Sequence, residues 1–352
     1  MGKINTRIVK INGINPEKEL IEEGAKFIRA GKLVAFPTET VYGLGANGLD
    51  EAAVEEIFIA KGRPQDNPLI LHVSSLEEVK PLVKEISKEA EILMKEFWPG
   101  PLTLLFKKST LVPMIITAGL DTVAIRMPNH PIAIELIKSS GVPIAAPSAN
   151  TSGKPSPTSA EHVIEDLYGK IHMIMDGGTT GVGLESTVLD LTVETPIILR
   201  PGGITLEDLK EILPDVELDA AIIKDDNKLV PKSPGQKYRH YAPKADMFVF
   251  VGQVEDIVKA IKERAGQLIE EGKTVGIMAT DETEHEYERG VIMSVGSRKN
   301  LGTIGQNLFN VIRRFDERKV DIILAEGVES FHIGTAIMNR LKKASGGKII
   351  KV

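Results

Sequence analysis

The chain has 352 residues, of which 42% are hydrophobic and 26% are charged, and its formal net charge is −6. This length exceeds one ordinary hydrophobic core and predicts two domains, while the net charge gives no general attraction to nucleic acid. The absence of cysteine excludes disulfides, thiol nucleophiles and cysteine-ligated zinc or iron–sulfur sites. No apolar run approaches the roughly 18 residues of a membrane span, and the N-terminus lacks the apolar core of a signal peptide, so we expect a cytoplasmic protein without membrane contact.

Helices and strands alternate along the first part of the chain. Asn15 and Pro16 predict the N-cap and first position of a helix that ends at Gly31, followed by a strand over 32–40 and a helix over 49–62. Further helices are predicted near residues 76–96, 129–140 and 159–168. Further strands are predicted at residues 69–73, 102–106, 123–127, 143–150, 186–191 and 196–202. Because strands outnumber helices, these patterns predict one α/β domain with a large sheet.

The character of the sequence changes after the first domain, which we place at residues 1–217. Residues 225–246 contain three prolines and one glycine, with five basic residues and no acidic residue between Lys228 and Lys244. This composition predicts a linker, with bounds at 218–245, rather than a helix or a strand. After it, strand and helix patterns alternate as in βα units, which predicts a small Rossmann-like domain over 246–352.

Neither of the two common nucleotide-binding loops is present. Gly266 and Gly272 are separated by five residues where a P-loop has four, and the predicted helix precedes them instead of following. The glycine-rich segment 177–183 does not fit the dinucleotide pattern either. A helix C-terminus and a turn are the simpler interpretation of the first segment, so a nucleotide would have to bind without either loop.

Hydroxyl, amide and cationic side chains gather at strand ends of the first domain. Lys61, Arg63 and Asn67 lie in a proline-containing turn, "KGRPQDNPLILHV", directly before a strand. Similar positions hold Thr38, Thr40, Thr122, Arg126, Ser148, Asn150, Ser156, Ser186, Thr187 and Arg200. In an open α/β sheet the strand ends line the binding crevice, and such side chains bind phosphate and carboxylate. They predict an anion-binding site, although helix-end and turn chemistry would also account for Lys61 alone.

His72 is the single histidine of the strand after this turn. Leu69, Leu71 and Val73 share the opposite face of that strand, so His72 is predicted to point toward the binding site. A hydrogen-bonded histidine within the core is the alternative interpretation.

Taken in order, the motifs resemble the YrdC family of threonylcarbamoyl-AMP synthases. They are "PTETVYGLG", "KGRPQDNPLILHV", "WPGPLTLLF", "AIRMPNHP", "APSANTSGKPSPT", "STVLDL" and "ILRPGGIT", and they span about residues 15–210. "SPGQKYRHYAP" resembles the linker of the long, two-domain form, and the C-terminal part resembles that form's smaller domain more loosely. The resemblance implies an α/β fold: an N-terminal YrdC-like twisted mixed-sheet domain with an open cleft, a basic proline-containing linker, and a small C-terminal Rossmann-like domain.

The resemblance also implies an activity. The family condenses L-threonine, bicarbonate and ATP, with Mg²⁺, to threonylcarbamoyl-AMP and pyrophosphate, which makes it an ATP-dependent nucleotidyltransferase. The product passes to a tRNA threonylcarbamoyltransferase complex, KEOPS-type or its bacterial counterpart, which completes the threonylcarbamoyladenosine modification of tRNAs that read ANN codons. Weak binding of tRNA by this chain is left open.

Site residues follow from the same resemblance, position by position. The catalytic residues, which would hold the ATP phosphates, are Lys61, Arg63, Ser148 and Asn150. Further ATP contacts are implied for Asn67, Thr122, Ser156, Arg200 and Tyr241. Threonine contacts are implied for Thr40, His72, Arg126, Ala146 and Ser186. No protein side chain is expected to bind the metal.

Other interpretations of the linker and of the protein's function remain. Residues 238–241 could fold over the ATP as a lid, or the basic linker could be a solvated tether. A non-catalytic module that binds double-stranded RNA or tRNA would share the fold, and a general ATP-dependent ligase would share the chemistry. The carbamoyl-transfer enzyme of hydrogenase maturation contains a related domain, but that family carries cysteine zinc motifs that this chain lacks.

Overall fold

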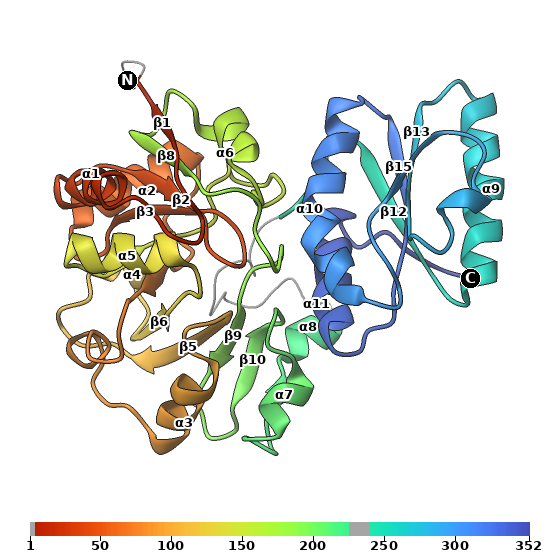
Figure 1. The fold of residues 1–352 in the computed structure, drawn as a ribbon. Helices are drawn as coiled ribbons and strands as arrows, with labels where there is room; N and C mark the ends of the chain where they lie inside the picture. The colour runs from red at the N-terminus through yellow and green to blue at the C-terminus, as the bar shows by residue number, and fades with distance from the viewer. Residues whose placement is uncertain (1–3, 225–239) are drawn as a thin grey trace. The chain divides into compact units, whose positions relative to one another are not determined.

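The computed structural model describes residues 4–224 and 240–352 (Figure 1). The chain forms two compact units. The first comprises Met1–Ser152 and Ser156–Tyr238, and the second comprises Gly153–Pro155 and Arg239–Val352. This division agrees with the two domains that the length of the chain predicts.

The first unit is a large mixed sheet flanked by helices. Its strands are β1 (Arg7–Lys10), β2 (Val34–Phe36), β3 (Gly43–Asn47), β4 (Ile70–His72), β5 (Leu102–Lys107), β6 (Thr122–Arg126), β7 (Ile144–Ala145), β8 (Met173–Asp176), β9 (Thr187–Asp190), β10 (Ile197–Arg200) and β11 (Glu217–Leu218). Its helices are α1 (Lys18–Arg29), α2 (Glu51–Lys61), η1 (Lys80–Leu82), α3 (Lys88–Phe97), α4 (Met114–Thr117), α5 (Pro131–Ser140), α6 (Ala160–Leu167), α7 (Leu206–Lys210) and α8 (Ala220–Lys224).

Within the described residues, the strands of this unit follow one another in the order β1-β8-β2-β3-β7-β4-β6-β5-β9-β10-β11. Pairs such as β4–β6 are parallel, whereas β3–β7 and β4–β7 are antiparallel, so the sheet is mixed. One core cluster packs α1 and α5 against the sheet through residues such as Ile28 and Leu136. A larger cluster contains Leu69, Leu71 and Val73, whereas Ile70, on the same face of β4 as His72, belongs to a separate cluster. The mixed sheet predicted for this domain is confirmed.

The helix α2 ends as the sequence predicts. Asp50 caps its N-terminus by accepting hydrogen bonds from the backbone of Ala52 and Ala53, and Gly62 ends it in the left-handed conformation with φ of 61°. That conformation strains residues with a Cβ atom, and glycine adopts it freely. Lys61 is therefore held in the last turn of α2, directly before the turn that leads to β4.

The start of α1 differs from the prediction. The N-cap is Glu17, and the helix begins at Lys18, not near Asn15 and Pro16. The side-chain oxygen of Asn12 accepts hydrogen bonds from the backbone of Ile14 and Asn15, each at 2.9 Å. This Asx turn engages the backbone of Asn15, which the sequence pattern assigned to the cap.

The long helix predicted near residues 76–96 is wrong. The segment contains η1 and, after a break, α3. Ser87 caps the N-terminus of α3, because its side chain accepts a hydrogen bond from the backbone of Ala90. In the break, Val83 is extended and bridges Lys108, and Lys84 donates a backbone hydrogen bond to Lys107 at 2.9 Å. Pairing with a neighbouring segment thus overrides helical periodicity here.

The second unit alternates strands and helices. Its strands are β12 (Asp246–Val251), β13 (Val275–Ala279), β14 (Val291–Ser294), β15 (Ile322–Glu326) and β16 (Ile349–Lys351), and its helices are α9 (Val254–Glu270), η2 (Glu284–Glu286), α10 (Leu301–Glu317) and α11 (Ile333–Ala344). The strand order is β14-β13-β15-β12-β16, and all pairs are parallel. The predicted Rossmann-like domain is confirmed. Helix α9 ends shortly before Gly272, which has φ of 82°, so the P-loop-like segment is a helix end and a turn.

The predicted linker coincides only in part with the described residues. It begins with the end of β11 and with α8, so regular structure extends beyond residue 217. Tyr238 and Arg239 lie outside the described residues. Tyr241 belongs to the second unit, where its buried ring lies 5.0 Å from the ring of Phe309 and 5.7 Å from the guanidinium of Arg340.

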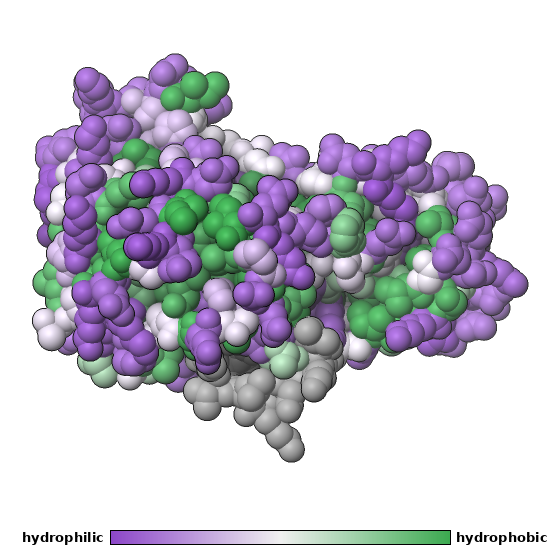
Figure 2. All heavy atoms as spheres, turned by 90° about the horizontal axis from the view of Figure 1, so that it is seen from below, coloured by the Kyte–Doolittle hydropathy of each residue, from purple (hydrophilic) through white to green (hydrophobic). Residues whose placement is uncertain are grey.

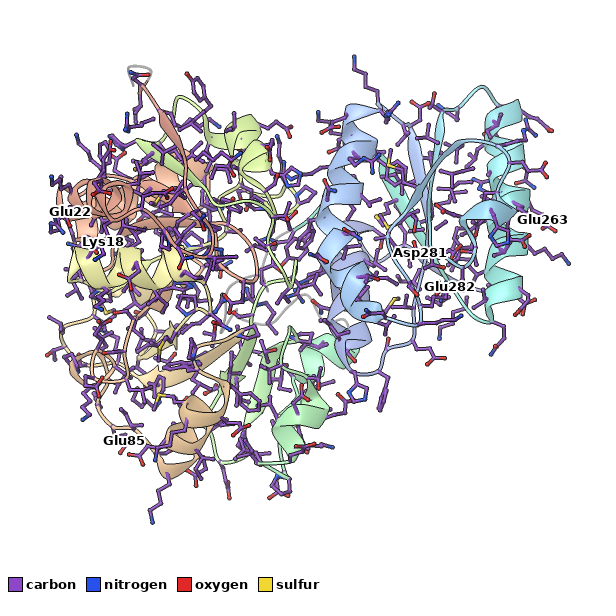
Figure 3. All side chains as sticks on the ribbon, viewed as in Figure 1. Lys18, Glu22, Glu85, Glu263, Asp281 and Glu282 are labelled. Atoms are coloured by element: carbon purple, nitrogen blue, oxygen red, sulfur yellow. The ribbon has the colours of Figure 1, made fainter. Side chains whose placement is uncertain are left out.

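Hydrophilic residues lie across the face of the molecule seen in Figure 2, with hydrophobic residues in patches between them. Figure 3 labels Lys18 and Glu22 on α1, where Glu22 forms a surface ion pair with Arg29 at 2.5 Å. In the part of the chain that the structure describes, no helix is long and apolar enough to cross a membrane.

Candidate active site

Lys61 joins the end of α2 to the loop that follows β7. Its Nζ donates hydrogen bonds to the carbonyl oxygens of Ser148 at 2.5 Å and Asn150 at 2.7 Å, and lies 3.4 Å from the Asn150 side-chain oxygen. Burial lowers the pKa of Lys61 well below its usual range, and the nearby charge of Arg63 lowers it further, while Asp166 acts in the opposite direction. Three of the four predicted catalytic positions are thus in direct contact.

Arg63, the fourth predicted catalytic position, stabilises the turn before β4. Its Nη2 donates to the carbonyl oxygens of Asn67 at 2.8 Å and Pro68 at 3.2 Å. The side-chain amide of Asn67 is fully buried, and neither its oxygen nor its nitrogen has a hydrogen-bond partner among the described residues. Leaving a buried polar group unpaired costs about 1–3 kcal/mol, so this amide is suited to contact a ligand.

Arg126 is the centre of the group predicted to bind threonine. Its Nε donates to the carbonyl of Gly100 at 3.1 Å, and its Nη1 donates to the Thr40 hydroxyl at 3.0 Å. The third nitrogen, Nη2, lies 2.7 Å from a carboxylate oxygen of Glu39. Only 4% of the Arg126 side chain is exposed, so the guanidinium is fixed in position and largely shielded from water.

His72 lies beside Arg126, because the two residues are partners in the parallel pairing of β4 and β6. Burial lowers the pKa of His72 to about 3, and the positive charges of Arg126 and Arg200 act in the same direction. The imidazole is therefore neutral at physiological pH. In the described residues its Nδ1 has no hydrogen-bond partner.

His72 should make the protein less stable as the pH falls. The unfolded chain binds a proton at His72 below its ordinary pKa of 6.5, whereas the folded chain does so only near 3. Because the unfolded state then binds more protons, the free energy of unfolding should fall by up to about 1.4 kcal/mol per pH unit in that interval. Urea unfolding of wild type and His72→Gln between pH 6.5 and 4.5 measures this, and the variant should show the smaller slope. Equal slopes would contradict a neutral, buried His72.

Ser186 and Arg200 meet at the other end of this group. Arg200 donates through Nε to the Ser186 carbonyl at 2.9 Å and through Nη2 to the Ser186 hydroxyl at 3.0 Å. The Ser186 hydroxyl also lies 2.8 Å from the hydroxyl of Thr103. A residue predicted to bind ATP thus contacts one predicted to bind threonine.

Gly202 keeps the backbone at Ser186 in place. A Cβ atom at Gly202 would lie 2.3 Å from the nitrogen of Thr187 and 2.5 Å from both the Ser186 carbonyl carbon and the Glu185 oxygen. We expect Gly202→Ala to lower the free energy of unfolding by about 1–3 kcal/mol, because overpacked backbone must shift, and to weaken threonine binding. Thermal unfolding and threonine titration measure both effects. Gly181→Ala is the matched control, since a Cβ there meets no atom within 4 Å, and equal behaviour of the two variants would contradict the prediction.

Apart from Tyr241, which belongs to the second unit, the remaining predicted residues lie in the first unit, near the same strands. The backbone of Ala146, directly after β7, donates to the Ile70 carbonyl of β4 at 3.1 Å. Ser148 bridges Gly43, and Ser156 donates a short hydrogen bond to a carboxylate oxygen of Glu185. Thr122 is the first residue of β6 and is only half-buried.

Three polar residues of this region are absent from the predicted site. They are Glu39, which pairs with Arg126, Thr103, which contacts Ser186, and Glu185, which contacts Ser156. The "PTET" motif contains Glu39, but a carboxylate repels anions and therefore does not belong to an anion-binding pattern. Thr103 lies inside an apolar strand, where only the pairing of β5 with β9 indicates its contact.

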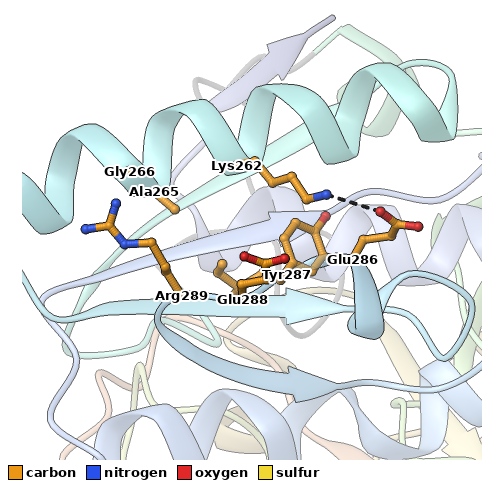
Figure 4. A pocket seen from close by; sticks show the side chains of 8 residues that line it. Lys262, Ala265, Gly266, Glu286, Tyr287, Glu288 and Arg289 are labelled. Carbon is orange, nitrogen blue, oxygen red and sulfur yellow. Dashed lines mark hydrogen bonds and ion pairs between the residues drawn. The ribbon is translucent and has the colours of Figure 1, made fainter.

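A pocket of about 250 Å³ lies in the second unit between α9 and the segment that follows η2 (Figure 4). Its walls include the apolar side chains of Ala265 and Ile277. The charged residues that line it are Lys262, Glu286, Glu288 and Arg289. Lys262 and Glu286 form an ion pair at 3.1 Å. Two acidic and two basic groups give the rim no net charge, so it does not favour an anion such as ATP.

The polar residues at the carboxyl ends of β13 and β15 bind one another. Buried Glu326 accepts hydrogen bonds from Thr280, Thr283, Tyr287 and Arg298. Figure 3 labels Asp281 and Glu282 near these strand ends. Burial opposes ionisation of Glu282, but hydrogen bonds from Ser297, Arg298 and Lys299 outweigh it and lower its pKa to about 2. This network stabilises the second unit.

No group of three or more histidine, aspartate or glutamate side chains placed to hold a metal ion occurs among residues 4–224 and 240–352. The described side chains therefore do not provide a metal-binding cluster of the usual kind.

The fold and the site together define an α/β enzyme with two domains, whose first domain brings cationic, amide and hydroxyl groups to neighbouring strand ends. Residues 26–202 match the family model Sua5_yciO_yrdC, described as "Telomere recombination", and residues 204–346 match the model of the threonylcarbamoyl-AMP synthase C-terminal domain.

Curated relatives match over nearly the whole chain. The threonylcarbamoyl-AMP synthase of Pyrococcus abyssi is 54% identical over 340 residues, covering 95% of this chain and 98% of that protein. The Bacillus subtilis enzyme of the same name is 48% identical, with 94% of each covered. The crystal structure of P. abyssi Sua5 with L-threonine superposes with a TM-score of 0.94, at 52% identity and with coverage of 98% of this chain and 99% of that one. The chain belongs to the threonylcarbamoyl-AMP synthase family, in the long form with a YrdC domain and a Sua5 C-terminal domain.

Proposed function

We propose that this enzyme condenses L-threonine, bicarbonate and ATP to threonylcarbamoyl-AMP and pyrophosphate. The similarity over both domains to threonylcarbamoyl-AMP synthases supports the reaction, and the L-threonine complex of the P. abyssi relative supports the amino acid. A non-catalytic RNA-binding module is not favoured, because full-length relatives are enzymes and no observation in the first domain favours nucleic acid.

One observation carries the proposal. Strands β7, β4 and β6 are neighbours in the sheet, so His72 is paired with Arg126, and Ala146 bonds Ile70, two residues before His72 on β4. The loop that follows β7 continues to Ser148 and Asn150, whose carbonyl groups bind Lys61. An amino-acid subsite and a phosphate subsite would therefore adjoin, as a reaction between the two substrates requires.

In the amino-acid subsite, Arg126 binds the threonine carboxylate, because a guanidinium presents paired donors that match a carboxylate. Thr40 and Ser186 offer hydroxyl groups, and Ala146 its backbone. Neutral His72 can accept or donate one hydrogen bond without adding positive charge beside Arg126.

In the nucleotide subsite, Lys61 and Arg63 neutralise charge on the triphosphate. Ser148 and Asn150 donate hydrogen bonds to phosphate oxygens, and Ser156 does so once its hydroxyl turns away from Glu185. Asn67, Thr122, Arg200 and Tyr241 are further proposed ATP contacts. For Asn67, the support is its buried amide, whose two polar atoms have no partner among the described residues.

The reaction proceeds in two steps. Threonine's amine nitrogen, once deprotonated, attacks the carbon of bicarbonate, and loss of water leaves a carbamate. A carbamate oxygen then attacks the α-phosphorus of ATP, and pyrophosphate leaves with the electron pair of the broken P–O bond. The protein contributes positioning and neutralisation of charge, and excludes water from labile intermediates.

Mg²⁺ enters this proposal as part of the substrate, bound to ATP phosphates, where it offsets negative charge. The product is passed to a tRNA threonylcarbamoyltransferase complex for modification of tRNAs that read ANN codons. Both ATP and tRNA are abundant in the cytoplasm, where we place the enzyme.

Pyrophosphate release tests the proposal when L-threonine and bicarbonate are omitted in turn. We expect release to require both, with L-serine a poor substitute. Release that needs neither would show a different ATP-cleaving enzyme. No release, together with RNA binding that weakens steeply with salt, would show an RNA-binding module.

A further inference from the structure

Glu39 is an acidic side chain within the proposed threonine subsite. It lies between Thr38 and Thr40, and its side chain is only 13% exposed. Its backbone carbonyl accepts a hydrogen bond from Val182 at 2.7 Å, which fixes the loop. The carboxylate is therefore held inside the site.

The carboxylate of Glu39 has unused capacity for hydrogen bonds. Each of its oxygens is almost completely shielded from solvent, and neither accepts a hydrogen bond from the described residues. The 2.7 Å contact with Arg126 is an ion pair whose angles fall outside hydrogen-bond geometry. A carboxylate can accept about four hydrogen bonds, and buried polar groups in folded proteins nearly always find partners. A donor supplied by a ligand would meet this need.

Two histidines lie near the Glu39–Arg126 pair: His130 is close to Glu39, and His72 is the pairing partner of Arg126. Burial lowers the pKa of His130, and the negative charge of Glu39 raises it in partial compensation, so the two groups are close. His72, the pairing partner of Arg126, has its pKa lowered to about 3 by burial and is neutral. The cation that contacts the Glu39 carboxylate is Arg126, at 2.7 Å, and Arg200 is a further cation near His72.

An adjacent anion and cation match an α-amino acid. In a zwitterion, the ammonium and the carboxylate are attached to the same carbon atom, so a complementary site must place a negative group directly beside a positive one. Arg126 has five N–H groups and uses three atoms for Gly100, Thr40 and Glu39, which leaves N–H donors on Nη1 and Nη2.

We propose that Glu39 binds the α-ammonium group of threonine while Arg126 binds its carboxylate. This inference rests on the proposed function, because it assumes that threonine occupies this subsite. Glu39 would then select amino acids over acids that lack the amine. If Glu39 served only to orient Arg126, every carboxylate ligand would depend on it equally.

Binding of two ligands to the intact protein separates these roles. The ligands are L-threonine and 2,3-dihydroxybutanoate of the same stereochemistry, in which a hydroxyl replaces the amine. Glu39→Gln keeps the size of the side chain but removes its charge, and Glu194→Gln, at an exposed loop position, is the matched control. Isothermal titration gives the affinity of wild type and of each variant for both ligands. Thermal unfolding shows whether each variant is folded.

We expect wild type and Glu194→Gln to bind threonine far more tightly than the hydroxy acid. In Glu39→Gln, threonine affinity should fall by roughly 10- to 100-fold, the range for a hydrogen bond to a charged group, while affinity for the hydroxy acid stays unchanged. An equal loss for both ligands, or no loss for either, would overturn the inference.

Wild type alone gives a second test that does not depend on folding of a variant. Equal affinity for threonine and the hydroxy acid would show that the ammonium is not recognised, and would overturn the role of Glu39. If wild type bound neither ligand and released pyrophosphate without threonine, the proposed function itself would be wrong.

Discussion

Replacing Lys61 by alanine should lower kcat for threonylcarbamoyl-AMP formation by roughly 100- to 1000-fold, the loss typical of removing one preorganised donor. Two effects act together. The ammonium group would no longer neutralise the triphosphate, and the carbonyl groups of Ser148 and Asn150 would lose their common partner. Steady-state pyrophosphate release, with ATP and threonine each varied, measures the effect.

Two comparisons sharpen this prediction. Lys95→Ala, at an exposed position of α3, removes the same charge far from these carbonyl groups and should keep wild-type turnover. A Lys61→Ala enzyme with full kcat and only a higher KM for ATP would show that Lys61 contributes to ground-state binding alone, against its proposed role in charge neutralisation during the reaction.

Replacing Arg126 by alanine should affect both stability and activity. Removal of one partner of a buried ion pair leaves the other charge uncompensated, so the free energy of unfolding should fall by about 3–5 kcal/mol. The KM for threonine should rise by roughly 100-fold, because the charge-assisted contact with its carboxylate is lost. Urea unfolding and threonine-dependent pyrophosphate release measure the two effects.

Arg7→Ala is the matched control, because Arg7 forms an ion pair with Glu23 on the surface, where both side chains are substantially exposed. Such pairs contribute about 0–1 kcal/mol. The double variant Arg126→Ala with Glu39→Gln should regain part of the lost stability, since no buried carboxylate is left unpaired. A double variant less stable than Arg126→Ala would contradict this explanation.

The order of strands and helices in the chain was largely predictable, because most of them have clear periodicity and clear ends. Gly62 and Gly31, for example, end their helices at positions with positive φ. Strands β1, β3, β8 and β11 were not predicted. In β3 two of the residues are glycines, which usually weaken strands. The structure gives the reason: a Cβ atom at Gly45 would lie 2.8 Å from the ring of Phe36 and 2.9 Å from Ile144. Such a close approach depends on neighbours far away in the sequence.

The site could be predicted as a set of residues but not as a set of contacts. Polar residues at strand ends indicated where Lys61, Asn150 and Arg126 belong. Sequence alone could not indicate that Lys61 binds backbone carbonyl groups, because those acceptors are present in every residue. Glu39 was missed for a different reason. Its role depends on its ion pair with Arg126, which is 87 residues away in the sequence.

Strand β1 has a consequence for the synthesis of the chain. It lies at the edge of the sheet, and its partner is β8, with Arg7 opposite Met173 and Lys10 opposite Asp176. At roughly 5–20 residues per second, the ribosome needs roughly ten to thirty seconds to add the intervening residues. Until then the apolar side chains of Ile8 and Val9 have no strand to pair with. The first strand to emerge thus cannot be incorporated until β8 has been synthesised, and a nascent chain stalled before β8 would present an unpaired strand to chaperones.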